Sequence, residues 1–80
     1  FKPAPESILV GWHLVQLFWK AGISREVLQF ITCVDEPVGS KLTKDNRIAA
    51  VVLTGATATA KLFMKMRPGL DLMAETGGKN

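Results

Sequence analysis

The apolar residues of this chain fall into runs of two kinds, one typical of a helix and the others typical of strands. In the range 8–19 almost every residue is apolar, as in a helix that is covered on more than one side. Pro5 suits a first helical position, Gly22 favours a left-handed stop, and Ile23 is the apolar residue that commonly folds back onto the last turn. The pattern predicts a helix over about 5–21, sandwiched between a sheet and another layer.

Three shorter runs have the length and the β-branched content of strands. They are Val27–Thr32, Arg47–Thr54 and Leu70–Glu75. Within the second run, Ile48–Leu53 contains no polar residue, which is typical of a strand buried on both faces.

Helical stretches separate these runs. Acidic residues and a proline at 35–37 predict a turn into a short helix that runs to about Lys44. A second helix is expected from Thr57 to about Met66, and its apolar face is expected to carry Leu62, Phe63 and Met66. Strands that alternate with helices predict parallel strands joined by right-handed crossovers. The predicted fold class is therefore α/β, as a doubly wound layer.

Size and composition bound the functional classes. Eighty residues with 48% apolar content make at most one domain and are too apolar for a disordered chain. Ten Lys/Arg against seven Asp/Glu give a net charge of +3, but the basic residues are spread over several elements, so no nucleic-acid surface is predicted. The longest apolar run is far below the roughly 18 residues that span a bilayer, so no transmembrane segment is expected.

The compartment is inferred from cysteine usage and from the first residues. The single cysteine, Cys33, cannot form an internal disulfide, and residues 1–6 lack a charged leader followed by an apolar run. Both features favour the cytoplasm. Phe1-Lys2 is expected to be the end of a strand that begins upstream.

Three places carry residues suited to chemistry. Gly55-Ala56 turns the chain from a strand into a helix, where free N–H groups attract anions, and Thr57 could cap that helix or donate to a phosphate oxygen. Glu75 ends a strand before two glycines, where a carboxylate can take a proton from water. Lys2 could donate to ribose hydroxyls. Taken singly, the glycine turn is more typical of a plain connection, Glu75 is more typical of a solvated strand end, and Lys2 can equally be read as one more surface lysine.

Together these segments resemble one family in order and spacing. Lys2-Pro3-Ala4, Leu53-Thr54-Gly55-Ala56-Thr57 and Glu75-Thr76-Gly77-Gly78-Lys79 are similar to three motifs of the aldehyde dehydrogenase superfamily. The resemblance covers essentially the whole chain. It identifies residues 1–80 as a fragment of a Rossmann-like NAD(P)-binding domain.

The resemblance implies roles for individual residues. Lys2 would contact the adenosine ribose, Gly39 and Leu53 would line the adenine side, and the Gly55-Ala56 backbone would hold the pyrophosphate. Thr57 and Thr76 complete the expected cofactor-binding set. Glu75 would be the general base that activates water to hydrolyse a thioester. No metal site is expected.

The family's nucleophilic cysteine would lie downstream of residue 80, so Cys33 is not that residue and the 80-residue piece alone is expected to be inactive. The cofactor is expected to be NAD, with NADP left open, because Pro5 stands where many members have a ribose-binding glutamate. Alanine also replaces the family's serine at 56 and a glycine at 60.

A narrower likeness is to the L-glutamate γ-semialdehyde dehydrogenase module of bifunctional proline-degrading enzymes. It is carried by three segments: Leu53–Ala60, Arg67–Leu70 and Ala74–Asn80. The implied substrate is that aldehyde, and the implied partners are the remainder of the parent enzyme and further copies in a homo-oligomer. Two alternatives stay open: a non-catalytic nucleotide-binding module, and an acylating or reductase-type relative that does not use water.

Overall fold

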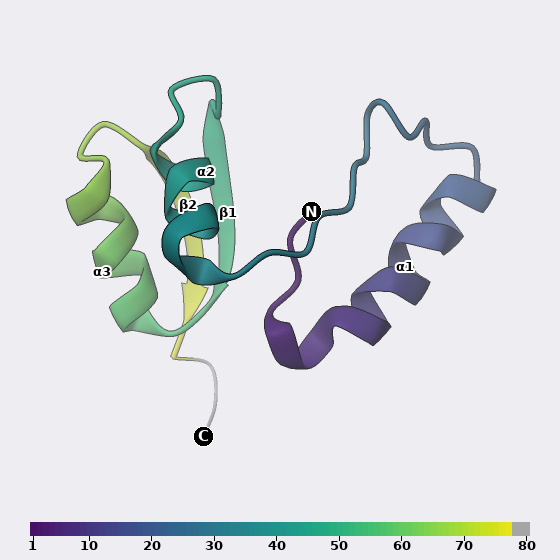
Figure 1. The fold of residues 1–80 in the computed structure, drawn as a ribbon, viewed down its shortest axis with the longest axis horizontal. Helices are drawn as coiled ribbons and strands as arrows, with labels where there is room; N and C mark the ends of the chain where they lie inside the picture. The colour runs from purple at the N-terminus through teal and green to yellow at the C-terminus, as the bar shows by residue number, and fades with distance from the viewer. Residues whose placement is uncertain (78–80) are drawn as a thin grey trace. The chain divides into compact units, whose positions relative to one another are not determined.

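The structure, a computed structural model, describes residues 1–77. The backbone forms two compact units, Phe1–Val34 and Asp35–Asn80, and each is described by itself below. Figure 1 shows the first unit as one long helix with flanking extended chain, and the second as strands with helices beside them. No helix within residues 1–77 is both long enough and apolar enough to cross a membrane.

The predicted first helix is present. A short turn of helix η1 (Pro5–Ser7) begins at the proline and leads into helix α1 (Ile8–Lys20). Gly22 follows with a φ of +106°, and its N–H donates to the carbonyl of Trp19 at 3.0 Å. The N–H of Ile23 donates to the carbonyl of Phe18 at 3.1 Å. These two bonds are the Schellman pattern, so the glycine ends the helix as predicted.

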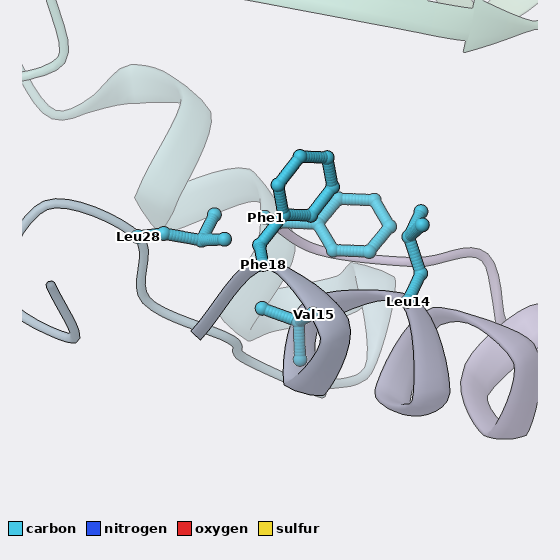
Figure 2. Close-up of a pocket in the computed structure, with 5 residues that line it drawn as sticks. All are labelled: Phe1, Leu14, Val15, Phe18 and Leu28. Carbon is cyan, nitrogen blue, oxygen red and sulfur yellow. The ribbon is translucent and has the colours of Figure 1, made fainter. Parts of the chain in front are cut away.

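A small apolar core holds this first unit together. Val15 is fully buried, and Gly11 of α1 lies directly against Pro3. Around Val15 an apolar pocket of about 250 Å³ is lined by Phe1, Leu14, Val15, Phe18 and Leu28, which Figure 2 shows as sticks. Within this unit the rest of α1 is mostly exposed, as at Leu9 and Val10, so residues 1–34 alone do not provide the layers expected on both sides.

The predicted strand over Val27–Thr32 is wrong, because no strand is present there. Instead, Phe1 pairs with this segment at one point. The Phe1 amino group donates to the Gln29 carbonyl at 2.7 Å, and the Ile31 N–H donates to the Phe1 carbonyl at 3.0 Å. This is the hydrogen-bond pattern of a single parallel bridge, and one bridge does not make a ladder.

The second unit contains the predicted alternation of helices and strands. Its elements are a helical turn η2 (Asp35–Gly39), helix α2 (Ser40–Lys44), strand β1 (Ala50–Gly55), helix α3 (Thr57–Met66) and strand β2 (Asp71–Thr76). The two strands are parallel neighbours in one sheet, with α3 as their connection (Figure 1). The α/β class predicted from the sequence is therefore confirmed.

The sheet has one covered face and one open face within this unit. Val51 and Leu53 are half-buried, whereas Val52 between them is 75% exposed. The alternation differs from the expected burial on both faces, because α3 contacts the strands from one side only. Ala60 is the buried residue of α3. The expectation that Leu62 belongs to the covered apolar face of this helix is wrong, since Leu62 is 48% exposed.

Candidate functional site

A pocket of about 690 Å³ lies at the carboxyl ends of β1 and β2. Its lining residues are Thr54, Gly55, Ala56, Thr57, Glu75, Thr76 and Gly77. Gly55 and Thr76 are the last residues of their strands and pair in register. In open parallel sheets, ligands bind beyond this end of the strands, where helices begin. The pocket therefore has the position expected of a ligand site.

The start of α3 supplies the donors of this pocket. Ala56 is the N-cap residue, with an extended backbone and no side-chain cap, and Thr57 is the first helical residue. The N–H groups of Thr59 and Ala60 already donate to the Ala56 carbonyl at 3.0 and 3.3 Å. The N–H groups of Thr57 and Ala58 precede these bonds, so they are the ones that can receive an anion.

The expectation that Thr57 could cap the helix is wrong, because Thr57 lies one residue inside it. Its hydroxyl instead donates to the hydroxyl of Thr76 across the pocket, with 3.1 Å between the two Oγ1 atoms. The bond joins the first residue of α3 to the last residue of β2.

Glu75 lies at the end of β2, on the face of the sheet opposite to α3. It is exposed and pairs in register with Thr54, so both side chains project from the open face of the sheet. Gly77 follows two residues later with a φ of +68°, a left-handed conformation that favours glycine. The chain can therefore turn sharply just after the carboxylate.

The other predicted site residues lie outside this pocket. Leu53 is half-buried on the covered face, where its Cδ1 lies 3.6 Å from the ideal Cβ position of Gly55. Gly39 ends η2, and its carbonyl accepts a hydrogen bond from the Thr43 hydroxyl at 3.1 Å. Lys2 belongs to the first unit and is half-buried there. Gly78 and Lys79 of the expected motif lie outside the described residues.

The lining fits the phosphates of a dinucleotide through backbone donors. Two N–H groups are available at the start of α3, and the missing side chain of Gly55 and the small one of Ala56 leave the backbone open to close approach. Among the described residues the lining contains no lysine or arginine, so within residues 1–77 the helix end provides the positive potential. Among residues 1–77, no three His, Cys, Asp or Glu side chains gather as metal ligands would.

Comparison with known proteins agrees with this geometry. The model of the aldehyde dehydrogenase family matches residues 1–80. The chain belongs to the aldehyde dehydrogenase family. Two of the segments that carried the resemblance, around Gly55 and around Glu75, lie at the ends of the two parallel strands that line the pocket.

Sequences of several known proteins are similar to nearly all of this chain. It is 34% identical to the bifunctional protein PutA of Escherichia coli (strain K12), over 99% of the chain and 7% of that protein. It is 35% identical to an aminoacetaldehyde dehydrogenase of Pseudomonas aeruginosa, over 99% of the chain and 16% of that protein. A 2,5-dioxopentanoate dehydrogenase of Saccharolobus solfataricus is 34% identical over the same share of the chain and 17% of its own length. The chain thus spans less than a fifth of these relatives.

Two residues of the candidate pocket were not among those predicted from the sequence as site residues. Thr54 reaches it because the register places it beside Glu75, and Gly77 because of its left-handed backbone. The alternation along β1 could have indicated Thr54, since the residue before the turn must face opposite to Gly55.

Proposed function

We propose that this chain is part of an NAD(P)-dependent aldehyde dehydrogenase and supplies part of its coenzyme site and its general base. The observation that supports this most directly is the shared pocket. It combines the start of α3 with Glu75 at the ends of two parallel neighbouring strands. Family membership supports the proposed reaction class, oxidation of an aldehyde to a carboxylate.

The described residues would act in two ways. The N–H groups of Thr57 and Ala58 would hold the pyrophosphate, with Gly55 and Ala56 allowing the backbone to approach it. When bound, the dinucleotide supplies the hydride acceptor. Glu75 would take a proton from a water molecule, which would then hydrolyse the acyl group held by a cysteine elsewhere in the enzyme. Lys2, Gly39, Leu53 and Thr76 complete the proposed cofactor-binding set.

The proposed coenzyme is NAD, with NADP as the alternative. An acidic residue near the ribose 2′-hydroxyl selects NAD because it repels the additional phosphate of NADP. Here Pro5 is followed by Glu6, an exposed acid at the start of η1. Turnover with each coenzyme, measured as the ratio of kcat/KM values, decides between the two.

The proposed substrate is L-glutamate γ-semialdehyde, on the strength of the likeness in Leu53–Ala60, Arg67–Leu70 and Ala74–Asn80. Relatives whose names give other aldehydes are as similar to this chain as PutA is. The substrate test therefore includes aminoacetaldehyde and 2,5-dioxopentanoate beside glutamate semialdehyde. The highest kcat/KM is expected for glutamate semialdehyde.

The reaction class is tested by NAD(P)H formation in the full-length enzyme. Absorbance at 340 nm should rise when an aldehyde and the coenzyme are present together, and the matching carboxylate should accumulate. An enzyme that binds NAD(P) but oxidises no aldehyde would contradict the proposal and favour a non-catalytic nucleotide-binding module. Release of a thioester in place of the carboxylate would favour an acylating relative.

A further inference from the structure

A side-chain hydrogen bond crosses the candidate pocket. The hydroxyls of Thr57 and Thr76 lie 3.1 Å apart although the residues are 19 positions apart in the chain. Thr57 opens the helix that offers N–H groups to an anion, and Thr76 closes the strand that carries Glu75. The bond therefore connects the expected phosphate-binding end of the pocket to the strand of the expected base.

The pleat of β2 gives this bond a consequence for Glu75. Successive side chains of a strand point to opposite faces, so a restraint that keeps Thr76 on the helix side also keeps Glu75 on the open side. Thr76 is half-buried and pairs in register with Gly55, which has no side chain to restrain it. On the other side, Gly77 has a left-handed backbone that leaves the strand end free to turn.

We infer that Thr57 and Thr76 form a positioning pair for Glu75, a role that rests on the proposed function of this pocket. The hydroxyl of Thr57 donates to Thr76, while its N–H is one of the two that are proposed to hold the anion. The two threonines thus fix the distance between the start of α3 and the end of β2. Glu75 acts on water, and the pair acts only through the orientation of Glu75.

Five variants of the full-length enzyme test this inference. Thr57→Val and Thr76→Val, alone and combined, remove the bond while keeping a β-branched side chain of similar size. Thr57→Ser and Thr76→Ser keep the hydroxyl. Thr59→Val is the matched control, because Thr59 lies on the same helix but does not line the pocket.

Rapid-mixing measurements of NAD(P)H formation separate positioning from loss of structure. If Glu75 is displaced, each valine variant should keep the first-turnover burst while its steady-state rate falls about fivefold, the size of one lost hydrogen bond. The double variant should fall no further than the singles, since both lose the same bond. Thr59→Val should match the wild type, and each serine variant should lose less of its steady-state rate than the valine variant at the same position, because serine keeps the hydroxyl.

Amide hydrogen exchange gives a second readout that does not depend on turnover. Exchange at residues 75–77 should be faster in Thr57→Val than in Thr59→Val, although residue 57 is far from them in sequence. Unchanged exchange there, or unchanged steady-state rates in both valine variants, would overturn the inference. If the wild type oxidises no aldehyde but exchange at residues 75–77 is still faster in Thr57→Val than in Thr59→Val, the proposed function is contradicted while the restraint on the strand end is established.

Discussion

Thr54 and Glu75 are register partners across the parallel strands β1 and β2, and both precede the last residue of their strand. Their side chains therefore project from the same open face of the sheet, whereas Gly55 and Thr76 point to the helix side. Glu75 is thus held on the face opposite to the Thr57–Thr76 hydrogen bond. This separation would let one strand end serve the proposed phosphate site and the proposed base at the same time.

Replacing Glu75 by glutamine removes the proposed base and keeps the size of the side chain. In the full-length enzyme we expect a first-turnover burst of NAD(P)H followed by a steady state slower by about 10²- to 10⁴-fold, since the acyl-enzyme is no longer hydrolysed efficiently. Asp71→Asn is the control, because Asp71 is an exposed carboxylate at the opposite end of the same strand. Undiminished turnover in Glu75→Gln would show that water is not activated by this residue.

Residues that start or end an element locally explain which elements the sequence could predict. The bounds of α3 were predicted as Thr57–Met66 and confirmed, because a glycine turn precedes the helix and Arg67-Pro68-Gly69 follows it. The strand over Val27–Thr32 failed for the opposite reason. Its β-branched residues fit a strand, but a strand exists only where neighbouring strands pair with it. Within residues 1–77 no strand is present there, and Phe1 contributes a single bridge.

In the candidate site, too, some features could be predicted from the sequence and others depend on contacts that the sequence does not reveal. Parallel strands bring their carboxyl ends together, so the topology was enough to place Gly55 and Glu75 at one pocket. The bond between Thr57 and Thr76 could not be predicted, because it depends on side-chain rotamers and on where the strand ends. Burial was predicted from the apolar run, yet Val52 is exposed because this unit covers one face only.

Two glycines of the pocket should respond differently to alanine. A Cβ at Gly55 would meet only the Leu53 Cδ1 at 3.6 Å, an ordinary contact, so Gly55→Ala should leave the unfolding temperature unchanged. It should raise the KM for the dinucleotide about tenfold, as expected when one hydrogen bond to a charged phosphate is lost. An unchanged KM would mean that the backbone at this turn does not approach the coenzyme.

Gly77→Ala should instead destabilise the strand end itself. Its φ of +68° costs a side chain about 1–2 kcal/mol, so the neighbouring amides should exchange hydrogen faster even without coenzyme. Gly69→Ala is the control, because a Cβ there would meet no atom within 4 Å and its backbone is not left-handed. Equal exchange at residues 75–77 in both variants would contradict this prediction.

The Asp45–Arg47 pair should make stability depend on acid pH. The Arg47 side chain donates two hydrogen bonds to the carboxylate, at 3.0 and 2.7 Å, and its N–H donates a third at 2.9 Å. These bonds hold the pKa of Asp45 well below its ordinary value near 4. Because the folded pKa is the lower one, the carboxylate stabilises the fold above about pH 4 and this contribution is lost as the pH falls.

The variant Asp45→Asn tests the direction of this pH dependence of stability. The variant should unfold at a slightly lower temperature than the wild type at pH 7, and the difference should shrink as the pH is lowered from 4 to 2. Sodium chloride at 1 M should reduce the difference at pH 7, because the Arg47 side chain is largely exposed. A difference that grows toward pH 2 would show that the carboxylate destabilises the folded chain.

Arg67 should hold the connection between α2 and β1. Its Nη1 donates to the carbonyls of Thr43 and Asp45, at 3.5 and 3.0 Å, and the Asp45 carbonyl also accepts the N–H of Ile48. Arg67→Met leaves these carbonyls without the charged donor, at a cost of about 1–3 kcal/mol. Hydrogen exchange of the Ile48 amide should then be roughly tenfold faster or more, since that amide reports local opening. Arg67→Lys should restore part of this protection. The control Lys65→Met, at an exposed position of α3, should leave the exchange of the Ile48 amide unchanged. If the Ile48 amide is as well protected in Arg67→Met as in the wild type, the loop keeps its shape without this side chain.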